Sequence, residues 1–237
     1  QKLTKTDSSG KTVTWGLLAP LMERFEWTLI AQNKGTILVK DSKNKWKVDI
    51  NEGAKKALNF YLDLITKYKV MPKDVISIDY TSLMQGFING SYAMVTFGCW
   101  NRRFLLQNKD MKWGMLLVKN GENKINASDP QAFGISSMSK YKDEAFEFIK
   151  FMTNTENSAK ISYDDYLFPV RDSALKDQRF DSQKNEWNLA KSWLTYSDNV
   201  KPGMPGFYSF EWKVFVPELE KVILGSIDLK TALDKIG

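Results

Sequence analysis

The sequence predicts an α/β fold in which helices cover a central sheet. Two observations lead to this prediction: short apolar runs of strand length occur along the chain, and segments with an apolar stripe at helical spacing lie between them. With 237 residues, 43% of them hydrophobic, the chain can bury a core in one large domain or in two small ones.

The first predicted elements are two helices. Glu52–Lys69 carries apolar side chains three and four positions apart, and this helix must end before Pro72, which cannot continue it. Leu83–Ile88 is a shorter amphipathic segment, and the following Asn89-Gly90 is typical of a C-terminal cap. We expect strands at three apolar runs, the first two as neighbours in one sheet: Tyr92–Phe97, Trp113–Val118 and Ala132–Ser136.

Helices resume in the second half of the chain. Tyr141–Met152 has one apolar face, and Thr153 with Glu156 forms a capping-box pair that opens the next helix. Asp165–Pro169 ends that helix. Three more helices are expected, with Pro217 interrupting the second of them: Trp187–Tyr196, Tyr208–Leu224 and Leu229–Ile236.

The composition excludes several classes of enzyme. The chain has no histidine, which removes Ser-His-Asp and Cys-His catalysis, the usual zinc sites and the commonest general base near neutral pH. No G-x-x-x-x-G-K-[ST] or G-x-G-x-x-G phosphate-binding loop occurs. The single cysteine, Cys99, follows an apolar run, which indicates a buried thiol rather than a nucleophile. We therefore expect no catalytic residue, no metal site and no cofactor.

The net charge of +6 does not form a basic patch. The lysines between Lys40 and Lys47 are interleaved with Asp41 and Asp49, and bases and acids alternate similarly elsewhere. We therefore expect a solvated, lysine-rich surface and no nucleic-acid partner. The apolar stretches also fall far short of the roughly 20 residues that a membrane span needs.

Four stretches, in this order and spacing, together resemble the bacterial extracellular solute-binding proteins of carbohydrate ABC importers, the maltose-binding-protein-like family. The most specific is Phe87–Met94 followed by Gly98-Cys99-Trp100, which matches the pattern F-x-x-G-x-x-A-M…G-x-W. The other three are Val48–Leu58 running into Phe60–Leu64, Phe133–Ser136 with Lys142–Ala145 and Phe148–Phe151, and Leu219–Gly225 with Thr231–Leu233.

The resemblance implies a periplasmic-binding-protein-like (type II) two-lobe fold, with a nearly complete C-terminal lobe and a partial N-terminal lobe. Residues 1–126 would begin the C-terminal lobe, 127–185 would belong to the N-terminal lobe, and 186–237 would return to the C-terminal lobe. A further N-terminal portion, which family members normally carry, is missing from this sequence.

The same resemblance implies a function. The protein would capture a sugar or oligosaccharide in an aromatic-lined cleft between the lobes and deliver it to the membrane permease of an ABC importer. It would work outside the cell, anchored at the cell surface, or in the periplasm. Its contact with the membrane would be through a lipid anchor on the missing N-terminus.

Aromatic rings that stack on sugar faces and polar groups that bond to hydroxyls make up the expected binding site. Trp100 occupies a family position that stacks on sugar, and Trp212 precedes Gly225 by about the same spacing as a sugar-stacking aromatic of maltose-binding protein. Tyr208 is a candidate because it follows the Pro205-Gly206 turn at a helix start, and Arg24 and Phe25 because they align near a cleft-lining aromatic of the family. The polar candidates, as hydroxyl partners, are Asn101, Arg102 and Glu211.

Two alternative functions need no histidine. A glycoside hydrolase requires only two carboxylates, but no acid pair in the sequence is tied to an aromatic-lined strand end. A cell-surface carbohydrate-binding module is the other alternative.

Overall fold

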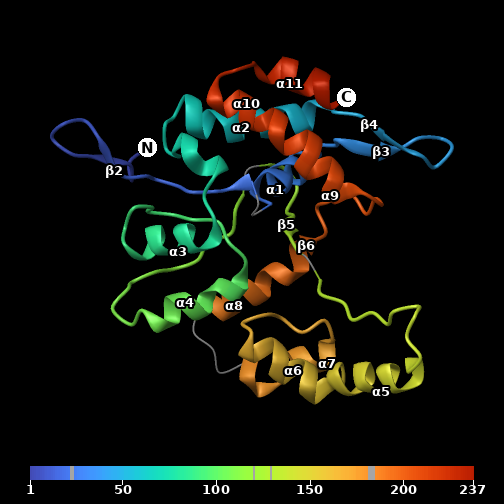
Figure 1. Ribbon diagram of the computed structural model, residues 1–237. Helices are drawn as coiled ribbons and strands as arrows, with labels where there is room; N and C mark the ends of the chain where they lie inside the picture. Colours follow the sequence, from blue (N-terminus) through green and yellow to red (C-terminus); the bar gives the residue numbers. More distant parts are fainter. Residues whose placement is uncertain (22–23, 120, 129, 181–184) are drawn as a thin grey trace. The chain divides into compact units, whose positions relative to one another are not determined.

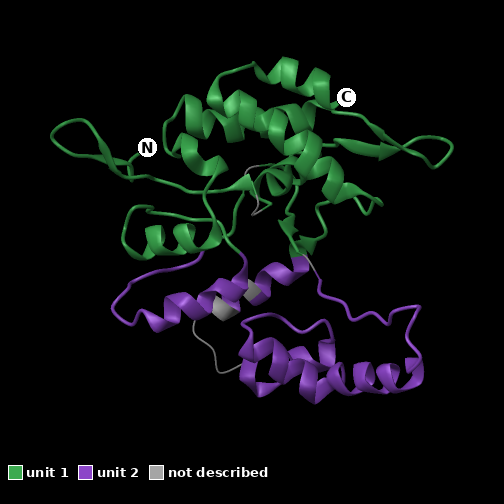
Figure 2. Ribbon diagram, in the orientation of Figure 1, with its two compact units in different colours: residues 1–97, 117–128, 196–237 green, residues 98–116, 129–195 purple. Residues whose placement is uncertain are grey.

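The computed structural model describes residues 1–21, 24–119, 121–128, 130–180 and 185–237. These residues form two compact units, each built from more than one stretch of the chain (Figure 2). Unit 1 contains residues 1–97, 117–128 and 196–237, and unit 2 contains residues 98–116 and 129–195. The assignment of segments to two lobes made from the sequence stays a prediction.

Unit 1 combines helices with short two-stranded sheets (Figure 1). Its helical segments are α1 (Phe25–Gln32), α2 (Glu52–Thr66), a 3₁₀ turn (Lys73–Ile76), α3 (Tyr80–Ile88), α9 (Phe207–Phe210), a π-helical turn (Glu211–Phe215), α10 (Val216–Leu224) and α11 (Leu229–Ile236). Its strand pairs are antiparallel β1 (Lys5–Thr6) with β2 (Thr12–Thr14), antiparallel β3 (Leu38–Lys40) with β4 (Trp46–Val48), and parallel β5 (Asn126–Ala127) with β6 (Ser197–Asp198).

Helix α1 lies in the core of unit 1. It is enclosed on all sides, and its buried residues are Phe25, Glu26, Trp27, Thr28, Leu29, Ile30 and Gln32. It packs against α2, where the ring of Phe25 lies 6.2 Å from that of Tyr61. The Tyr61 hydroxyl donates to the carbonyl oxygen of Ala19 at 2.8 Å, so this buried phenol is satisfied. Helix α10 packs against α2 and α11 and adds its buried residues Val216, Leu219 and Ile223 to the core of unit 1.

The helices predicted from apolar periodicity in unit 1 are confirmed. Helix α2 begins at Glu52 and ends before Pro72, and α11 spans the predicted residues. Helix α3 begins earlier than predicted, with Asp79 as its N-cap. It ends at Asn89-Gly90, and Gly90 has φ of 78°, in the left-handed region that favours glycine.

The three predicted strands are wrong as regular strands. Residues of Tyr92–Phe97 make isolated parallel bridges, with Trp15 opposite Tyr92 and Leu18 opposite Val95. Trp113–Val118 and Ala132–Ser136 are neither strand nor helix. An apolar run becomes a strand only where a neighbouring backbone supplies hydrogen-bond partners, and in the described part of the chain neither of these two runs has such a neighbour.

Two helix boundaries also differ from the sequence prediction. Pro217 does not interrupt the last long helical segment, because it lies in the first turn of α10, directly after the π-helical turn. The predicted capping box at Thr153 is wrong by one residue. Thr153 bonds back to the carbonyl of Ile149 and closes α5, whereas Asn154 caps α6 by accepting from the backbone N–H of Asn157.

Unit 2 is helical in its described residues. Its elements are a 3₁₀ turn (Cys99–Asn101), α4 (Arg102–Gln107), α5 (Lys142–Met152), α6 (Thr155–Asp164), α7 (Asp172–Leu175), a 3₁₀ turn (Gln178–Phe180), α8 (Asn185–Trp193) and a 3₁₀ turn (Leu194–Tyr196). Ala159, Ala174 and Phe180 form a small buried cluster. Helix α5 forms as predicted, but it buries no residue, and its phenylalanines are exposed.

Across the described residues of both units, no helix is long and apolar enough to cross a membrane.

Replacement of Asn51 by alanine should destabilise unit 1 by about 1–2 kcal/mol. Its Oδ1 accepts from the N–H groups of Ala54 and Thr36, and its Nδ2 donates to the carbonyl of Lys34, each at 3.0 Å. Asp79→Ala is the matched control, since Asp79 caps α3 by accepting from the N–H of Ser82 at 2.7 Å, within the first turn of its own helix. Urea unfolding should give the larger loss for Asn51→Ala; equal losses would contradict a stabilising role for the contacts of Asn51 with the loop at Lys34 and Thr36.

Candidate functional site

Three segments of unit 1 meet at the carboxylate of Glu211. Trp27 of α1 donates from Nε1 to Glu211 Oε1 at 2.8 Å. Lys201, in the loop after β6, places its Nζ 2.8 Å from Oε1 and 2.9 Å from Oε2. The side chains of Lys201 and Glu211 are only 10% and 2% exposed. Two charges withdrawn from water in this way need close pairing and additional hydrogen bonds, and Trp27 supplies one.

Aromatic rings surround this ion pair. The indole of Trp27 lies 5.3 Å from the ring of Phe207, edge to face, and 5.1 Å from that of Phe215. Phe210 stacks on Phe215 at 6.2 Å. We call these four rings, Trp27, Phe207, Phe210 and Phe215, the aromatic base. Their apolar surroundings lower the local dielectric and strengthen the pairing of Lys201 with Glu211.

Two further aromatic residues of the same helical segment face solvent. Tyr208 is 64% exposed and Trp212 is 47% exposed. They lie four positions apart along the helix, a spacing that brings side chains to one side. Lys201 Nζ lies 5.6 Å from the ring centres of both Tyr208 and Phe207, within the range of a cation–π contact. Lys201 of the ion pair therefore contacts both the buried ring of Phe207 and the exposed ring of Tyr208.

Glu26 is a second buried carboxylate beside this cluster. It is fully buried on α1, and among the described residues neither of its oxygens has a side-chain hydrogen-bond partner. Burial raises the pKa of Glu26 to about 8. The charge of Glu211 contributes to this rise in the pKa, while contact with its own backbone N–H and the charges of Lys201 and Arg24 oppose it. Glu26 is therefore largely protonated at neutral pH, and Lys201 compensates Glu211.

The predicted residues Arg24 and Phe25 stand at the start of α1. Arg24 adopts φ of 60°, and its carbonyl accepts from the N–H and the hydroxyl of Thr28. Phe25 is buried against Tyr61 and therefore has a core position in this structure. Of the predicted residues in unit 1, Tyr208 and Trp212 present rings to solvent, and Glu211 lies beneath them.

The other predicted residues, Trp100, Asn101 and Arg102, belong to unit 2. The indole of Trp100 lies against the backbone of Gly98, where a Cβ would come within 2.0 Å of the ring, so only glycine leaves room for it. Asn101 and Arg102 are buried, and the Arg102 guanidinium lies 5.6 Å from the ring centre of Tyr166. Burial also raises the pKa of the Cys99 thiol, which fits the predicted unreactive cysteine.

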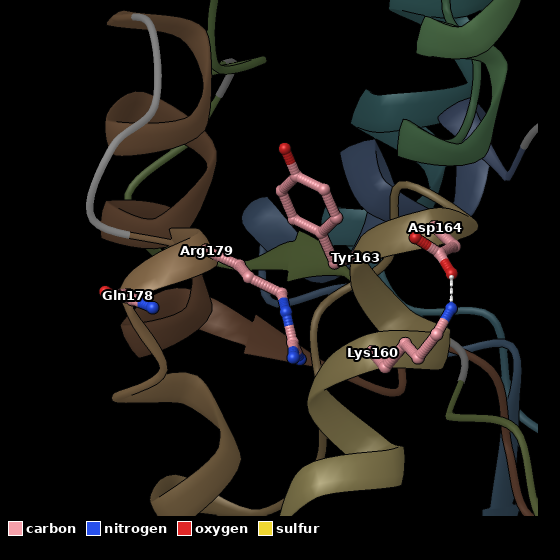
Figure 3. Close-up of a pocket in the computed structure, with 5 residues that line it drawn as sticks. All are labelled: Lys160, Tyr163, Asp164, Gln178 and Arg179. Carbon is pink, nitrogen blue, oxygen red and sulfur yellow. Dashed lines mark hydrogen bonds and ion pairs between the residues drawn. The ribbon is translucent and has the colours of Figure 1, made fainter.

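Unit 2 also contains an open cavity of about 470 Å³ that the sequence did not indicate (Figure 3). It lies between α6 and the 3₁₀ turn Gln178–Phe180, and its lining residues are Lys160, Tyr163, Asp164, Gln178 and Arg179. Lys160 pairs with Asp164 at 2.6 Å, and Arg179 lies 3.5 Å from Asp177. Because both cations have acidic partners, this cavity offers hydrogen-bonding groups rather than a strong anion site.

A family model described as bacterial extracellular solute-binding protein matches residues 1–188. The chain belongs to this family. The match covers most of the chain and confirms the resemblance found in the sequence. A comparison with curated proteins found no match.

Solved structures share the fold of this family member, the type II periplasmic-binding-protein fold. The maltose/maltodextrin-binding domain MalE from Bdellovibrio bacteriovorus bound to maltotriose has a TM-score of 0.74 and 18% identity, and the match covers 99% of this chain and 61% of that one. An ABC substrate-binding protein from Listeria monocytogenes in complex with cycloalternan has a TM-score of 0.72 and 22% identity, over 98% of this chain and 58% of that one.

Maltose-bound MalE3 from T. maritima has a TM-score of 0.72 and 18% identity, over 94% of this chain and 59% of that one. This chain therefore spans about 60% of the length of these solved structures.

Sequence reasoning missed three residues of the cluster in unit 1. Glu26, Lys201 and Trp27 were not among the predicted site residues. The contact between Trp27 and Glu211 joins residues 184 positions apart, and no local pattern reports such a pairing. A charged residue inside an otherwise apolar helix, as Glu26 is in α1, was the one available signal.

Stability should fall as pH rises from about 5 to about 8, and Glu26→Gln should flatten this dependence. The pKa of Glu26 is raised from 4.5 to about 8 on folding, so between these values the folded state binds more protons than the unfolded state. Each unit of pKa difference between the folded and unfolded states changes the free energy of unfolding by about 1.4 kcal/mol, so the total change over this pH range is a few kcal/mol.

Urea unfolding at several pH values measures this slope. Besides Glu211, Lys201 and Arg24, the Tyr61 hydroxyl is coupled to Glu26, and burial keeps that phenol protonated by raising its pKa. Glu122→Gln is the control, because Lys34 lowers the pKa of that exposed carboxylate and its titration falls below this window. A Glu26→Gln protein with the wild-type slope would show that Glu26 is ionised in the folded state.

Proposed function

We propose that this chain is part of the solute-binding component of an ABC importer, and that it captures a sugar or oligosaccharide and delivers it to a membrane permease. One observation carries the proposal: Tyr208 and Trp212 hold aromatic rings in solvent, on a helix whose buried side is fixed by the ion pair and the aromatic base. Membership of the solute-binding family supports it.

The chemistry of these rings suits a saccharide. A sugar ring offers flat C–H faces to aromatic side chains and hydroxyls to polar groups, and Tyr and Trp combine an apolar face with a hydrogen-bonding edge. Three solved relatives by fold were crystallised with maltotriose, cycloalternan or maltose. By analogy we place Trp100 of unit 2 among the ligand-binding residues, with Asn101 and Arg102 beside it.

The proposed place of action is outside the cytoplasm. The family description is extracellular, which supports work at the cell surface or in the periplasm. A permease is the expected partner because a solute-binding protein of an ABC importer hands over its solute. A lipid anchor on a preceding N-terminal portion remains part of the proposal.

The glycoside hydrolase alternative receives no support from the acidic residues near the exposed rings. A hydrolase needs two carboxylates that flank the scissile bond of a bound sugar. Glu26 and Glu211 are both buried, and Glu211 is occupied by Trp27 and Lys201. Incubation with oligosaccharides, followed by chromatography of the products, tests this alternative beside a melting-temperature screen: stabilised protein with uncleaved sugar supports binding.

Trp100→Ala in the full-length protein should weaken binding of the solute identified in that screen by roughly 1–3 kcal/mol, the range for loss of a large aromatic contact. Isothermal titration calorimetry measures the change. Trp46→Ala is the matched control, because Trp46 lies in the β3–β4 hairpin beside Lys40 and is not among the proposed ligand-binding residues. Unchanged affinity in a folded Trp100→Ala protein would falsify the assignment.

A further inference from the structure

Strand pairing and hydrogen bonds fix the backbone of the loop just before Lys201. β6 pairs with β5, and the Asp198 carboxylate accepts from the N–H of Asn199 at 2.7 Å. The Asn199 side chain in turn accepts from the N–H of Lys201 at 3.1 Å. These bonds restrict the position of the Lys201 backbone.

The Lys201 ammonium group has two different contacts. It pairs with both oxygens of Glu211, and it lies 5.6 Å from the centres of the Phe207 and Tyr208 rings. Phe207 is buried in the aromatic base, whereas Tyr208 is the most exposed ring of this helical segment. Tyr208 is 64% exposed, and its ring also contacts the edge of the neighbouring Phe207 at 6.1 Å, so without Lys201 it would keep few packing partners and sample more rotamers.

A buried ion pair is a costly way to stabilise a fold. Apolar residues of the same size often stabilise a core as well as or better than a desolvated lysine and glutamate. The pair is therefore more informative as a device that fixes geometry. What it fixes here is the loop, the π-helical turn that begins at Glu211, and the ring of Tyr208.

We propose that Lys201 is a positioning residue for solute binding: paired with Glu211, it holds the exposed ring of Tyr208 in one orientation before the solute arrives. The inference rests on the proposed sugar-binding function. A pre-ordered ring spares the entropy that binding would otherwise lose, so Lys201 contributes to affinity without touching the solute.

The variant that tests this is the double substitution Lys201→Met with Glu211→Gln in the full-length protein. Lys201→Met alone would leave a buried, uncompensated carboxylate and could unfold the unit. The double variant removes both charges, and the glutamine oxygen still accepts from Trp27 Nε1. Lys213→Met is the matched control, since it removes an exposed lysine two residues beyond Glu211.

Calorimetry with the sugar that stabilises the wild type should show binding weakened by roughly three- to tenfold, the cost of ordering one side chain. The loss should disappear when Tyr208→Ala is the background, because there is then no ring to position. An unchanged affinity, or an equal loss in the Tyr208→Ala background, overturns the inference. Wild-type protein that binds no sugar overturns the proposed function instead.

A ligand-free measurement keeps the two failures apart. In protein labelled with 3-fluorotyrosine, the ¹⁹F resonance of Tyr208 is assigned by its loss in Tyr208→Phe. This resonance should move and narrow in the double variant and stay in place in Lys213→Met, because the ring gains rotational freedom only when Lys201 is removed. A Tyr208 resonance that is the same in the double variant and the wild type overturns the positioning role, whatever the sugar results.

Discussion

The hydrogen-bonded ion pair of Lys201 and Glu211, completed by the indole N–H of Trp27, joins three segments of unit 1, and Trp27 lies 184 positions from Glu211 in the chain. An ionised carboxylate is buried without a large penalty only where donors meet it, so the burial of Glu211 requires these segments to come together. The central helix α1 supplies Trp27, the loop after β6 supplies Lys201, and the π-helical turn supplies Glu211. The aromatic base packs against this polar contact, because Trp27 belongs to both.

The two buried carboxyl groups of this cluster, Glu26 and Glu211, have different surroundings. Lys201 lies near two buried carboxylates, and a single ammonium group cannot compensate both in a low dielectric. Glu211 receives direct contacts from Trp27 and Lys201, whereas Glu26 lacks side-chain donors in the described residues, and its raised pKa of about 8 keeps it protonated at neutral pH. The interior of unit 1 thus holds one ion pair and one neutral acid, an arrangement that changes when Glu26 ionises above its raised pKa.

Sequence reasoning succeeded where structure depends on local pattern and failed where it depends on distant partners. The helices α2 and α11 follow from apolar spacing and capping residues that lie within them. Trp113–Val118 has the composition of a strand but no neighbouring backbone to pair with in the described part of the chain. Trp212, chosen through the family resemblance, and Tyr208, chosen for its place at a helix start, are exposed rings, but the buried contacts beneath them could not be foreseen from local spacing.

Exposed aromatic residues alone do not mark a binding surface in this protein. Helix α5 also presents rings to solvent, those of Phe146, Phe148 and Phe151, yet this helix buries none of its residues. A phenylalanine ring has no hydrogen-bonding edge, so such a face can exclude water but cannot meet hydroxyls. Tyr208 and Trp212 differ from these phenylalanines in two ways: their rings carry polar edges, and the helical segment that carries them packs on the buried aromatic base. Amphipathic rings on a packed, buried base, rather than exposure alone, are what distinguish this position from α5.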